Sequence, residues 1–301
     1  MTNGQRILDF LIEQSGKDKI SISFYPYICD MWDSMSSIFY AALNNDHVES
    51  VNVIPLLYTT AMFKKGFSRW YMRDSFLMDF YKGSEPDYSD YAIIHNPYDG
   101  INLITRVHYD YYSTELKKKC GKLVYIPYFY DPYGGCEAKA PGARNADYIF
   151  ACTEAQRDFY IKNGKPASKV YSFGSPKIDG LDVNNECSDT GSVLLAGGLM
   201  CCINEGLDRV KKWQEVIDKI TEEGRLIVFK PHPLTTQGVY AMKGYEKAKA
   251  FQEAFDEIFA KYGVRHGVPN NLIINCCSEA YLDPGSMQFI WQLTGKPYET
   301  I

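Results

Sequence analysis

Short apolar runs alternate with amphipathic stretches along the first half of the chain. Apolar residues in consecutive or alternating positions predict strands, and apolar residues three or four positions apart predict helices. Strands are predicted at 19–25, 51–57, 91–94, 123–126 and 148–151, and helices at 6–14, 32–43, 111–118 and 153–162. Because strands and helices take turns, we expect a parallel sheet with helices on both faces.

The pattern breaks near Gly174-Ser175-Pro176, and residues 182–191 are polar with little periodicity. We take this region as the link between an N-terminal domain, 1–175, and a C-terminal domain, 176–301. In the second half, strands are predicted at 192–196 and 226–230, helices at 206–223, 245–262 and 286–293, and short apolar elements at 273–275 and 280–282. The expected fold class is α/β, with two facing Rossmann-like, doubly wound domains that bind ligands at the carboxyl ends of their strands.

The last residues, 295–301, have the pattern of a loop that enters a strand. A doubly wound domain normally continues into helices that cover its sheet. We therefore expect the C-terminal domain to be truncated or unusually short.

Composition narrows the class of protein. A length of 301 residues fits two domains of ordinary size, and 46% hydrophobic with 23% charged residues indicates a globular chain. A net charge of −5 offers no basic surface, so we expect no nucleic-acid partner. The sequence has neither a signal peptide nor a run of about 18 apolar residues, which favours a cytoplasmic protein.

Nine cysteines, an odd number in a chain of this size, favour a reducing compartment. Cys201-Cys202 and Cys276-Cys277 are adjacent pairs, without the C-x-x-C spacing that lets two thiolates bind one metal ion. We therefore predict buried thiols, no metal site and no cofactor.

The segment Lys230-Pro231-His232-Pro233 follows a predicted strand directly. Proline fixes its own φ angle and restricts the residue before it, so His232 is expected in a stiff, extended loop at the carboxyl end of the strand. A cation and an imidazole in that place suit a diphosphate, whose charge grows as its bond to the transferred group breaks. A rigid turn with a structural histidine explains the same residues equally well.

A second anion-binding candidate is Asp283-Pro284-Gly285-Ser286, just before the predicted helix 286–293. Gly285 and Ser286 at a helix start leave backbone N–H groups that point at the preceding loop. Ser286 is expected to act as the N-cap or as a phosphate contact. Ordinary helix capping is the alternative explanation.

A second histidine, His95, also follows a predicted strand, in the N-terminal domain. A neutral imidazole there could remove the proton from an acceptor hydroxyl. His108 lies in a tyrosine-rich stretch and is a weaker candidate, whereas His47 and His266 have polar surroundings typical of surface residues.

Two glycine-containing segments complete the candidates for donor binding. Gly174, Ser175 and Lys177 supply a glycine and a cation at the predicted hinge. Gly197 and Gly198 follow the first strand of the C-terminal domain and would allow a ligand to approach the backbone. The pair fits neither G-x-G-x-x-G nor G-x-x-x-x-G-K-[ST], and the chain has no H-E-x-x-H, G-x-S-x-G or Asp-x-Asp.

Taken together, these segments resemble the CDP-glycerol glycerophosphotransferase family, which makes teichoic-acid-like polymers. The resemblance extends from about residue 19 to the end of the chain. In order, its motifs are Tyr25-Pro26-Tyr27, Met31-Trp32-Asp33-Ser34, Val53-Ile54-Pro55, Ile94-His95-Asn96-Pro97-Tyr98-Asp99, Tyr125-Ile126-Pro127-Tyr128-Phe129, Gly174-Ser175-Pro176-Lys177-Ile178-Asp179, Lys230-Pro231-His232-Pro233, Gly285-Ser286 and Thr294-Gly295-Lys296-Pro297.

The resemblance implies a GT-B fold without a metal, in which the C-terminal domain binds a CDP-linked donor. It implies that His95 is the catalytic base, that His232 binds the donor diphosphate, and that Asp283 and Ser286 form an acidic-serine motif near the donor. The implied reaction is attack of an acceptor hydroxyl on the β-phosphorus of CDP-glycerol, with release of CMP. Lipid-linked or glycan acceptors then imply possible peripheral contact at the inner face of the membrane.

Two departures from the family pattern leave other donors open. Lys230 stands where arginine is common, and Gly197-Gly198 replaces a hydroxyl-rich loop. CDP-ribitol, or a nucleotide sugar used by a GT-B glycosyltransferase, is therefore an alternative donor. A second alternative is a non-catalytic nucleotide-binding module.

Overall fold

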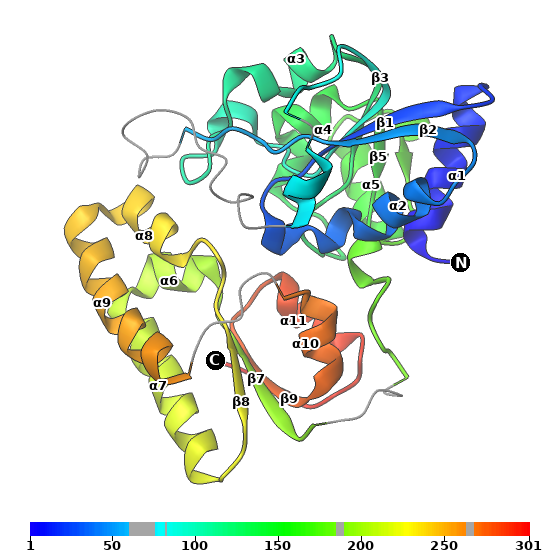
Figure 1. The fold of residues 1–301 in the computed structure, drawn as a ribbon. Coiled ribbons are helices and arrows are strands. Elements are labelled where there is room, and N and C mark those ends of the chain that lie inside the picture. Colours follow the sequence, from blue (N-terminus) through cyan, green and yellow to red (C-terminus); the bar gives the residue numbers. More distant parts are fainter. Residues whose placement is uncertain (60–75, 82, 185–189, 263–267) are drawn as a thin grey trace. The chain divides into compact units, whose positions relative to one another are not determined.

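The computed structural model describes residues 1–301 apart from 60–75, 82, 185–189 and 263–267 (Figure 1). The chain forms two compact units, Met1–Asp179 and Gly180–Ile301. Within the described residues, none of the helices has the length and apolar character needed to cross a bilayer.

The first unit contains a six-stranded parallel sheet in the order β2-β1-β3-β4-β5-β6. Its strands are β1 (Ile20–Tyr25), β2 (Val48–Val53), β3 (Ser89–Ile94), β4 (Cys120–Tyr125), β5 (Tyr148–Phe150) and β6 (Val170–Tyr171). Because every strand runs in the same direction, the loops that follow the strands gather at one edge of the sheet.

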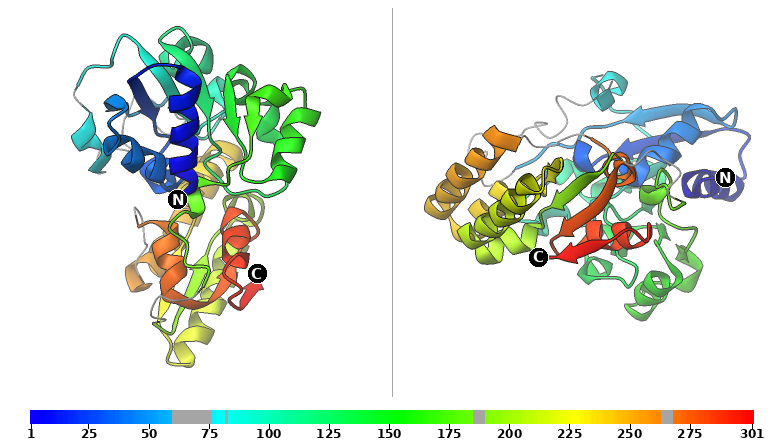
Figure 2. Two further views of the ribbon diagram at one scale, coloured as in Figure 1. Left: turned by 90° about the vertical axis from the view of Figure 1, so that its right-hand side faces the viewer. Right: turned by 90° about the horizontal axis from the view of Figure 1, so that it is seen from below.

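Helices pack on both faces of this sheet (Figure 2). The helices are α1 (Asn3–Ser15), α2 (Asp33–Leu43), α3 (Ser113–Leu116), α4 (Pro141–Asn145) and α5 (Glu154–Lys162). The apolar sides of α1 and α2 share one core cluster with Ile22, Ile93 and Val124 of the strands. Neighbouring side chains of a strand point to opposite faces, so Tyr125 points away from that cluster, where it contacts Tyr160 of α5.

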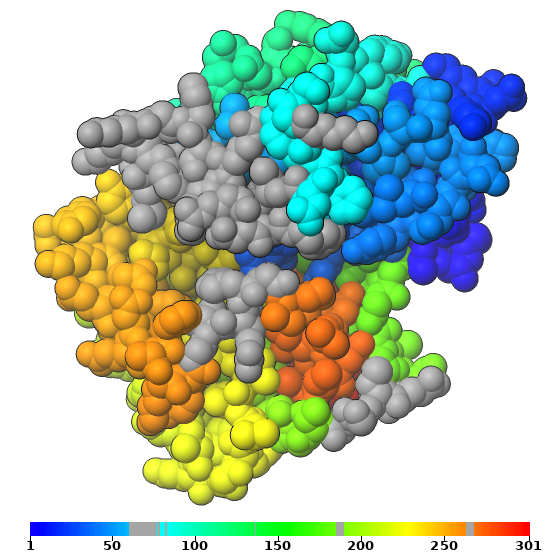
Figure 3. Space-filling view, in the orientation of Figure 1, coloured from blue at the N-terminus to red at the C-terminus, as the bar shows by residue number. Residues whose placement is uncertain are grey.

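The second unit contains a four-stranded parallel sheet in the order β10-β9-β7-β8. Its strands are β7 (Ser192–Ala196), β8 (Ile227–Lys230), β9 (Cys277–Leu282) and β10 (Tyr298–Thr300), and its helices are α6 (Leu199–Glu205), α7 (Leu207–Glu222), α8 (Thr235–Lys243), α9 (Tyr245–Tyr262), α10 (Asn270–Cys276) and α11 (Ser286–Gln292). The apolar sides of α7 and α9 pack against Val193, Leu195 and Phe229, whereas α10 and α11 lie on the opposite face (Figure 1). In the space-filling view, α8 and α9 form part of the outer surface of this unit (Figure 3).

The division between the units follows Asp179 rather than residue 175, where the sequence predicted it. The Asp179 carboxylate accepts hydrogen bonds from the backbone N–H groups of Asn3 (2.8 Å) and Gly4 (2.9 Å) and from the Ser37 hydroxyl (2.6 Å). A carboxylate is favourable at a helix N-terminus, where backbone N–H groups lack partners within the helix. These bonds attach residues 176–179 to α1 and α2 of the first unit.

Most predicted elements are present, and the differences have local causes. The strand predicted at 51–57 begins at Val48, because an edge strand carries polar residues that hide the apolar signal, and it ends before Pro55, which lacks a donor for the sheet. Residues 273–275 belong to helix α10. Helix α8 was not predicted, since Gly238 lowers its helix propensity, but this glycine lets α8 pack closely on Leu199 and Ile203.

A second close helix crossing depends on Gly4 in α1. A Cβ atom at this position would lie 2.6 Å from the backbone nitrogen of Ile38 in α2. We predict that Gly4→Ala lowers the free energy of unfolding by about 1–3 kcal/mol, although alanine is the better helix former. Glu13→Ala, an exposed change on the same helix, serves as the control in urea denaturation. A Gly4→Ala protein as stable as the wild type would contradict the close crossing.

Candidate functional site

The carboxyl edge of the first sheet places His95 directly after β3, as the sequence predicted. The imidazole is fully buried. Its Nε2 accepts a hydrogen bond from the backbone N–H of Tyr27, so the proton of the neutral ring is on Nδ1. That N–H donates to the Ser34 hydroxyl (2.7 Å), which in turn donates to the carbonyl of Met31 (2.9 Å). Both ring nitrogens of His95 are therefore occupied by the protein itself.

Electrostatics also hold His95 in its neutral form. Burial, with a smaller contribution from the Lys177 ammonium, lowers the pKa of His95 to about 3. A general base needs a pKa near the working pH and a nitrogen that reaches the substrate proton. In this arrangement His95 meets neither condition, so the structure argues against the base role that the sequence suggested. His95 instead fixes the loop after β1 to the start of α2.

Gly174, Ser175 and Lys177, predicted at the hinge as donor-binding residues, all lie in the first unit, whereas the predicted domain boundary had placed Lys177 in the C-terminal domain. Gly174 has a φ of +88°, which favours glycine, and a Cβ there would lie 2.5 Å from the Asn3 side chain. The Ser175 carbonyl accepts from the Asn3 amide (3.0 Å), and its buried hydroxyl accepts from the backbone N–H of Lys177 (3.3 Å). These residues thus join the end of the first unit to the start of α1.

A cluster of tyrosines surrounds His95 at the same edge, and sequence reasoning did not identify it. Tyr128, after β4, lies with its ring 5.2 Å from that of Tyr27, and its hydroxyl lies 3.3 Å from the hydroxyl of Tyr98. Tyr58 donates from its hydroxyl to the Tyr27 carbonyl. Each tyrosine belongs to a different loop, so no single stretch of sequence shows the cluster.

Two other histidines, His47 and His108, lie within the described part of the first unit. His47 is exposed, as predicted, whereas His266 lies outside the described residues. His108 is half-buried, with its Nδ1 3.0 Å from the Asp110 carboxylate. The backbone N–H of His108 donates to the carbonyl of Leu57 (2.8 Å), in the segment that follows β2.

In the second unit, the sheet register brings the predicted donor-binding loops together. Ala196, the last residue of β7, pairs with Lys230 of β8 on one side and with Leu282 of β9 on the other. The residues that follow these three positions therefore leave the sheet side by side. They include Gly197, Gly198, His232, Asp283, Gly285 and Ser286.

His232 is half-buried in the loop after β8. Its Nδ1 accepts a hydrogen bond from the backbone N–H of Leu234 (3.1 Å), so Nδ1 carries no proton and the neutral ring carries it on Nε2. The loop bends back through a second bond from the Thr235 N–H to the His232 carbonyl (3.2 Å). The structure thus fixes the ring as an Nε2–H donor.

Lys230, two residues earlier, is almost fully buried at the end of β8. Its ammonium donates to the carbonyl of Val268 (3.2 Å). A buried ammonium keeps much of its electrostatic attraction for an anion, because less water screens it.

Asp283 is also buried, but its carboxylate is bonded within the protein. One oxygen accepts from the backbone N–H of Gly198 (2.6 Å) and the other from the guanidinium of Arg209 (2.9 Å). Burial raises the pKa of Asp283, and the bonds from Gly198 and Arg209 oppose that rise. The predicted donor contact at Asp283 is thus replaced by a structural ion pair, and Arg209 is a residue that sequence reasoning missed.

The two glycines after β7 allow close packing within the second unit. A Cβ atom at Gly197 would lie 2.4 Å from the ring of Trp213, and one at Gly198 would lie 2.9 Å from the Cβ of Asp283. Because the Gly198 N–H already donates to Asp283, it is not a donor for a phosphate.

Helix α11 begins after Gly285, which occupies the N-cap position with a φ of +155°. Glycine offers no side chain to cap the helix, so the prediction of Ser286 as the N-cap is wrong. Ser286, the first residue of the helix, is half-buried at the same edge as His232.

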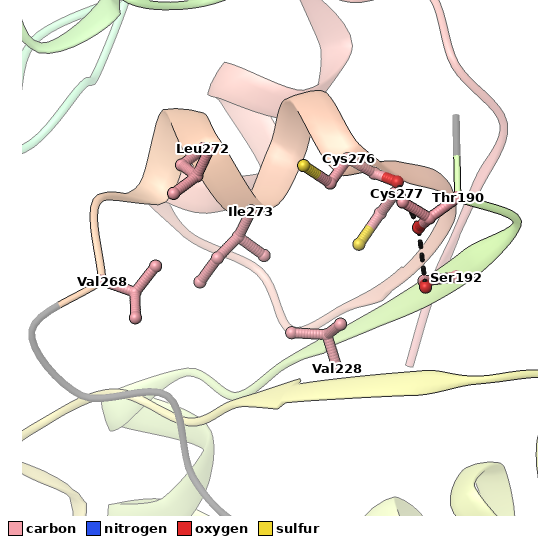
Figure 4. Close-up of a pocket in the computed structure, with 8 residues that line it drawn as sticks. All are labelled: Thr190, Ser192, Val228, Val268, Leu272, Ile273, Cys276 and Cys277. Atoms are coloured by element: carbon pink, nitrogen blue, oxygen red, sulfur yellow. Dashed lines mark hydrogen bonds between the residues drawn. The ribbon is translucent and has the colours of Figure 1, made fainter. Parts of the chain in front are cut away.

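A cavity of about 200 Å³ lies elsewhere in the second unit (Figure 4). It is lined by Val228 and by apolar side chains of α10, and reaches Ser192 and Cys277, the first residues of β7 and β9. The cavity is therefore near the amino ends of β7 and β9. Among the residues that the structure describes, no group of three or more His, Cys, Asp or Glu side chains is arranged to hold a metal ion.

Known structures share this architecture. No protein-family model matches the chain, and no curated protein matches it by sequence. UDP-GlcNAc 2-epimerase from Neisseria meningitidis bound to UDP-GlcNAc is similar with a TM-score of 0.52 and 12% identity, over 94% of this chain and 82% of that one. The Methanocaldococcus jannaschii enzyme in complex with UDP-GlcNAc and UDP gives 0.50 and 13%, over 94% and 83%. The chain has a GT-B-like fold. The predicted fold class, with two Rossmann-like units, is confirmed.

The buried, neutral His95 predicts a pH dependence of stability. Its pKa is about 3 in the folded chain against an ordinary value of 6.5, so the unfolded chain binds more protons between these values. The free energy of unfolding therefore falls as the pH falls. Between about pH 7 and pH 5, His95 accounts for a decrease of about 2 kcal/mol in this free energy. In urea denaturation, His95→Gln should lose this part of the pH dependence, whereas the exposed control His47→Gln should keep it. Equal pH dependence in His95→Gln and the wild type would show that His95 is not held neutral.

Proposed function

We propose that this chain is a GT-B-fold enzyme that binds a nucleotide-linked sugar at the carboxyl edge of the second sheet and acts on the bond between sugar and diphosphate. One observation carries the proposal: the loop after β8 holds His232 as an Nε2–H donor two residues from the buried cation Lys230. The likeness to epimerases that bind UDP-GlcNAc supports a nucleotide sugar as the ligand.

The chemistry of a diphosphate fits these two side chains. Negative charge grows on the diphosphate as its bond to the sugar breaks, and a fixed donor and a fixed cation stabilise that charge without reorganising. The bond from the Leu234 N–H orients the ring in advance, and the two prolines restrict the backbone around it. Lys230, almost fully buried at the end of β8, supplies a positive charge at this edge.

Transfer of glycerol phosphate from CDP-glycerol is the second candidate function. Its support is the set of motifs that resemble that family, and the same Lys230 and His232 would serve its donor diphosphate. This candidate lacks an identified catalytic base, because both nitrogens of His95 are bonded within the protein. This candidate therefore needs a different group to remove the proton of the acceptor hydroxyl.

Thermal unfolding with a panel of nucleotides tests the proposal. We predict that a UDP-sugar raises the melting temperature more than CDP-glycerol or CDP-ribitol, since a ligand at 100 times its Kd stabilises by about 2.7 kcal/mol. His232→Ala should reduce the shift markedly, and the exposed control His47→Ala should not. If none of these ligands stabilises the wild type, the proposal is wrong, whereas a larger shift with CDP-glycerol would favour the second candidate.

NMR of the nucleotide sugar, incubated with the protein with and without glycan acceptors, tests whether a reaction takes place. Release of free nucleotide, or a changed sugar, would support an enzyme. A ligand that binds tightly and stays intact with every acceptor would instead support a non-catalytic nucleotide-binding module.

A further inference from the structure

One buried ion pair connects two of the loops at the carboxyl edge of the second sheet. Arg209 of α7 donates to Asp283 after β9, and the same carboxylate accepts from the backbone N–H of Gly198 after β7. Arg209 is 3% exposed and Asp283 is 3% exposed. The guanidinium thus determines, through one carboxylate, where the ends of two neighbouring strands lie.

The ion pair continues into a balanced charge network on α6 and α7. The second guanidinium nitrogen of Arg209 donates to Glu205, and the other oxygen of Glu205 accepts from Lys212 (2.9 Å). The network holds two acidic and two basic side chains and therefore adds no net charge to the edge. Arg209 reaches two carboxylates at once, which a planar guanidinium can do and the single ammonium of a lysine does less well.

We propose that Arg209 is a positioning residue of the nucleotide site. It acts through Asp283, which holds the Gly197-Gly198 turn and the start of the Pro284-Gly285-Ser286 loop in the places that a bound diphosphate requires. This inference rests on the proposed function, because it concerns the same edge of the sheet. It assigns Arg209 no contact with the ligand, since its two terminal nitrogens are bonded to carboxylates.

The energetic reason lies in the cost of an unpaired buried charge. Removal of Arg209 leaves the Asp283 carboxylate buried without its cation, and the loop must shift to bring water to it. The shift would move Gly198, whose N–H is bonded to that carboxylate, and Gly285, two residues beyond Asp283. A ligand that contacts both loops would then lose affinity, although no contact atom has been removed.

The experiment compares Arg209→Met with Lys211→Met in the full chain. Lys211 lies on the same helix and is exposed, with its ammonium paired to Asp208. The Lys211→Met substitution therefore removes the same charge outside the network. The ligand is whichever of UDP, CDP, GDP and ADP stabilises the wild type most. Isothermal titration calorimetry measures the binding of this nucleoside diphosphate and of the corresponding nucleoside. We expect Arg209→Met to weaken diphosphate binding about tenfold and nucleoside binding by less than about twofold, and Lys211→Met to change neither.

A double-mutant cycle with Asp283→Asn tests the route through Asp283. If Arg209 acts through this carboxylate, the double variant should bind the diphosphate no more weakly than Arg209→Met alone. Additive losses, unchanged diphosphate binding, or an equal loss for diphosphate and nucleoside would overturn the positioning role. Failure of the wild type to bind any of the four diphosphates would instead overturn the proposed function on which it rests.

Discussion

Polar groups at the carboxyl edge of a parallel sheet need hydrogen-bond or ion-pair partners once the loops bury them. This constraint applies to both units. An unpaired buried donor or charge costs several times what a hydrogen bond contributes, so each such group determines the position of the loop that satisfies it. In the first unit His95 joins the loop after β1 to α2. In the second, Asp283 joins the turn after β7 to α7.

The same constraint separates two histidines that look alike in the sequence. Each follows a strand and precedes an Asn-Pro or a Pro. His95 is fully buried with both nitrogens bonded to protein groups, which makes it structural. His232 is half-buried, and a backbone N–H on Nδ1 leaves the Nε2–H as the donor of the ring. We therefore place the proposed nucleotide site in the second unit, where the buried Lys230 lies two residues before His232.

Local pattern was sufficient to predict the alternation of strands and helices, including β7 and α9 with the bounds observed. It also placed His232 correctly at the end of its strand. The role of His95 could not be predicted, because the groups that bury it are 61 and 68 positions away in the chain. Arg209 was missed for the same reason: it reads as an ordinary helix residue, and its partner Asp283 is 74 positions away.

We propose that the phosphate site of this chain lies at His232 and not at His95. Nitrogen-15 NMR of the imidazole rings during titration with UDP tests it directly, since the chain has five histidines and each can be assigned by substitution. We expect the His232 Nε2 resonance to shift on binding, while His95 keeps the signature of a neutral ring protonated on Nδ1. A shift of the His95 resonances with those of His232 unchanged would contradict the account.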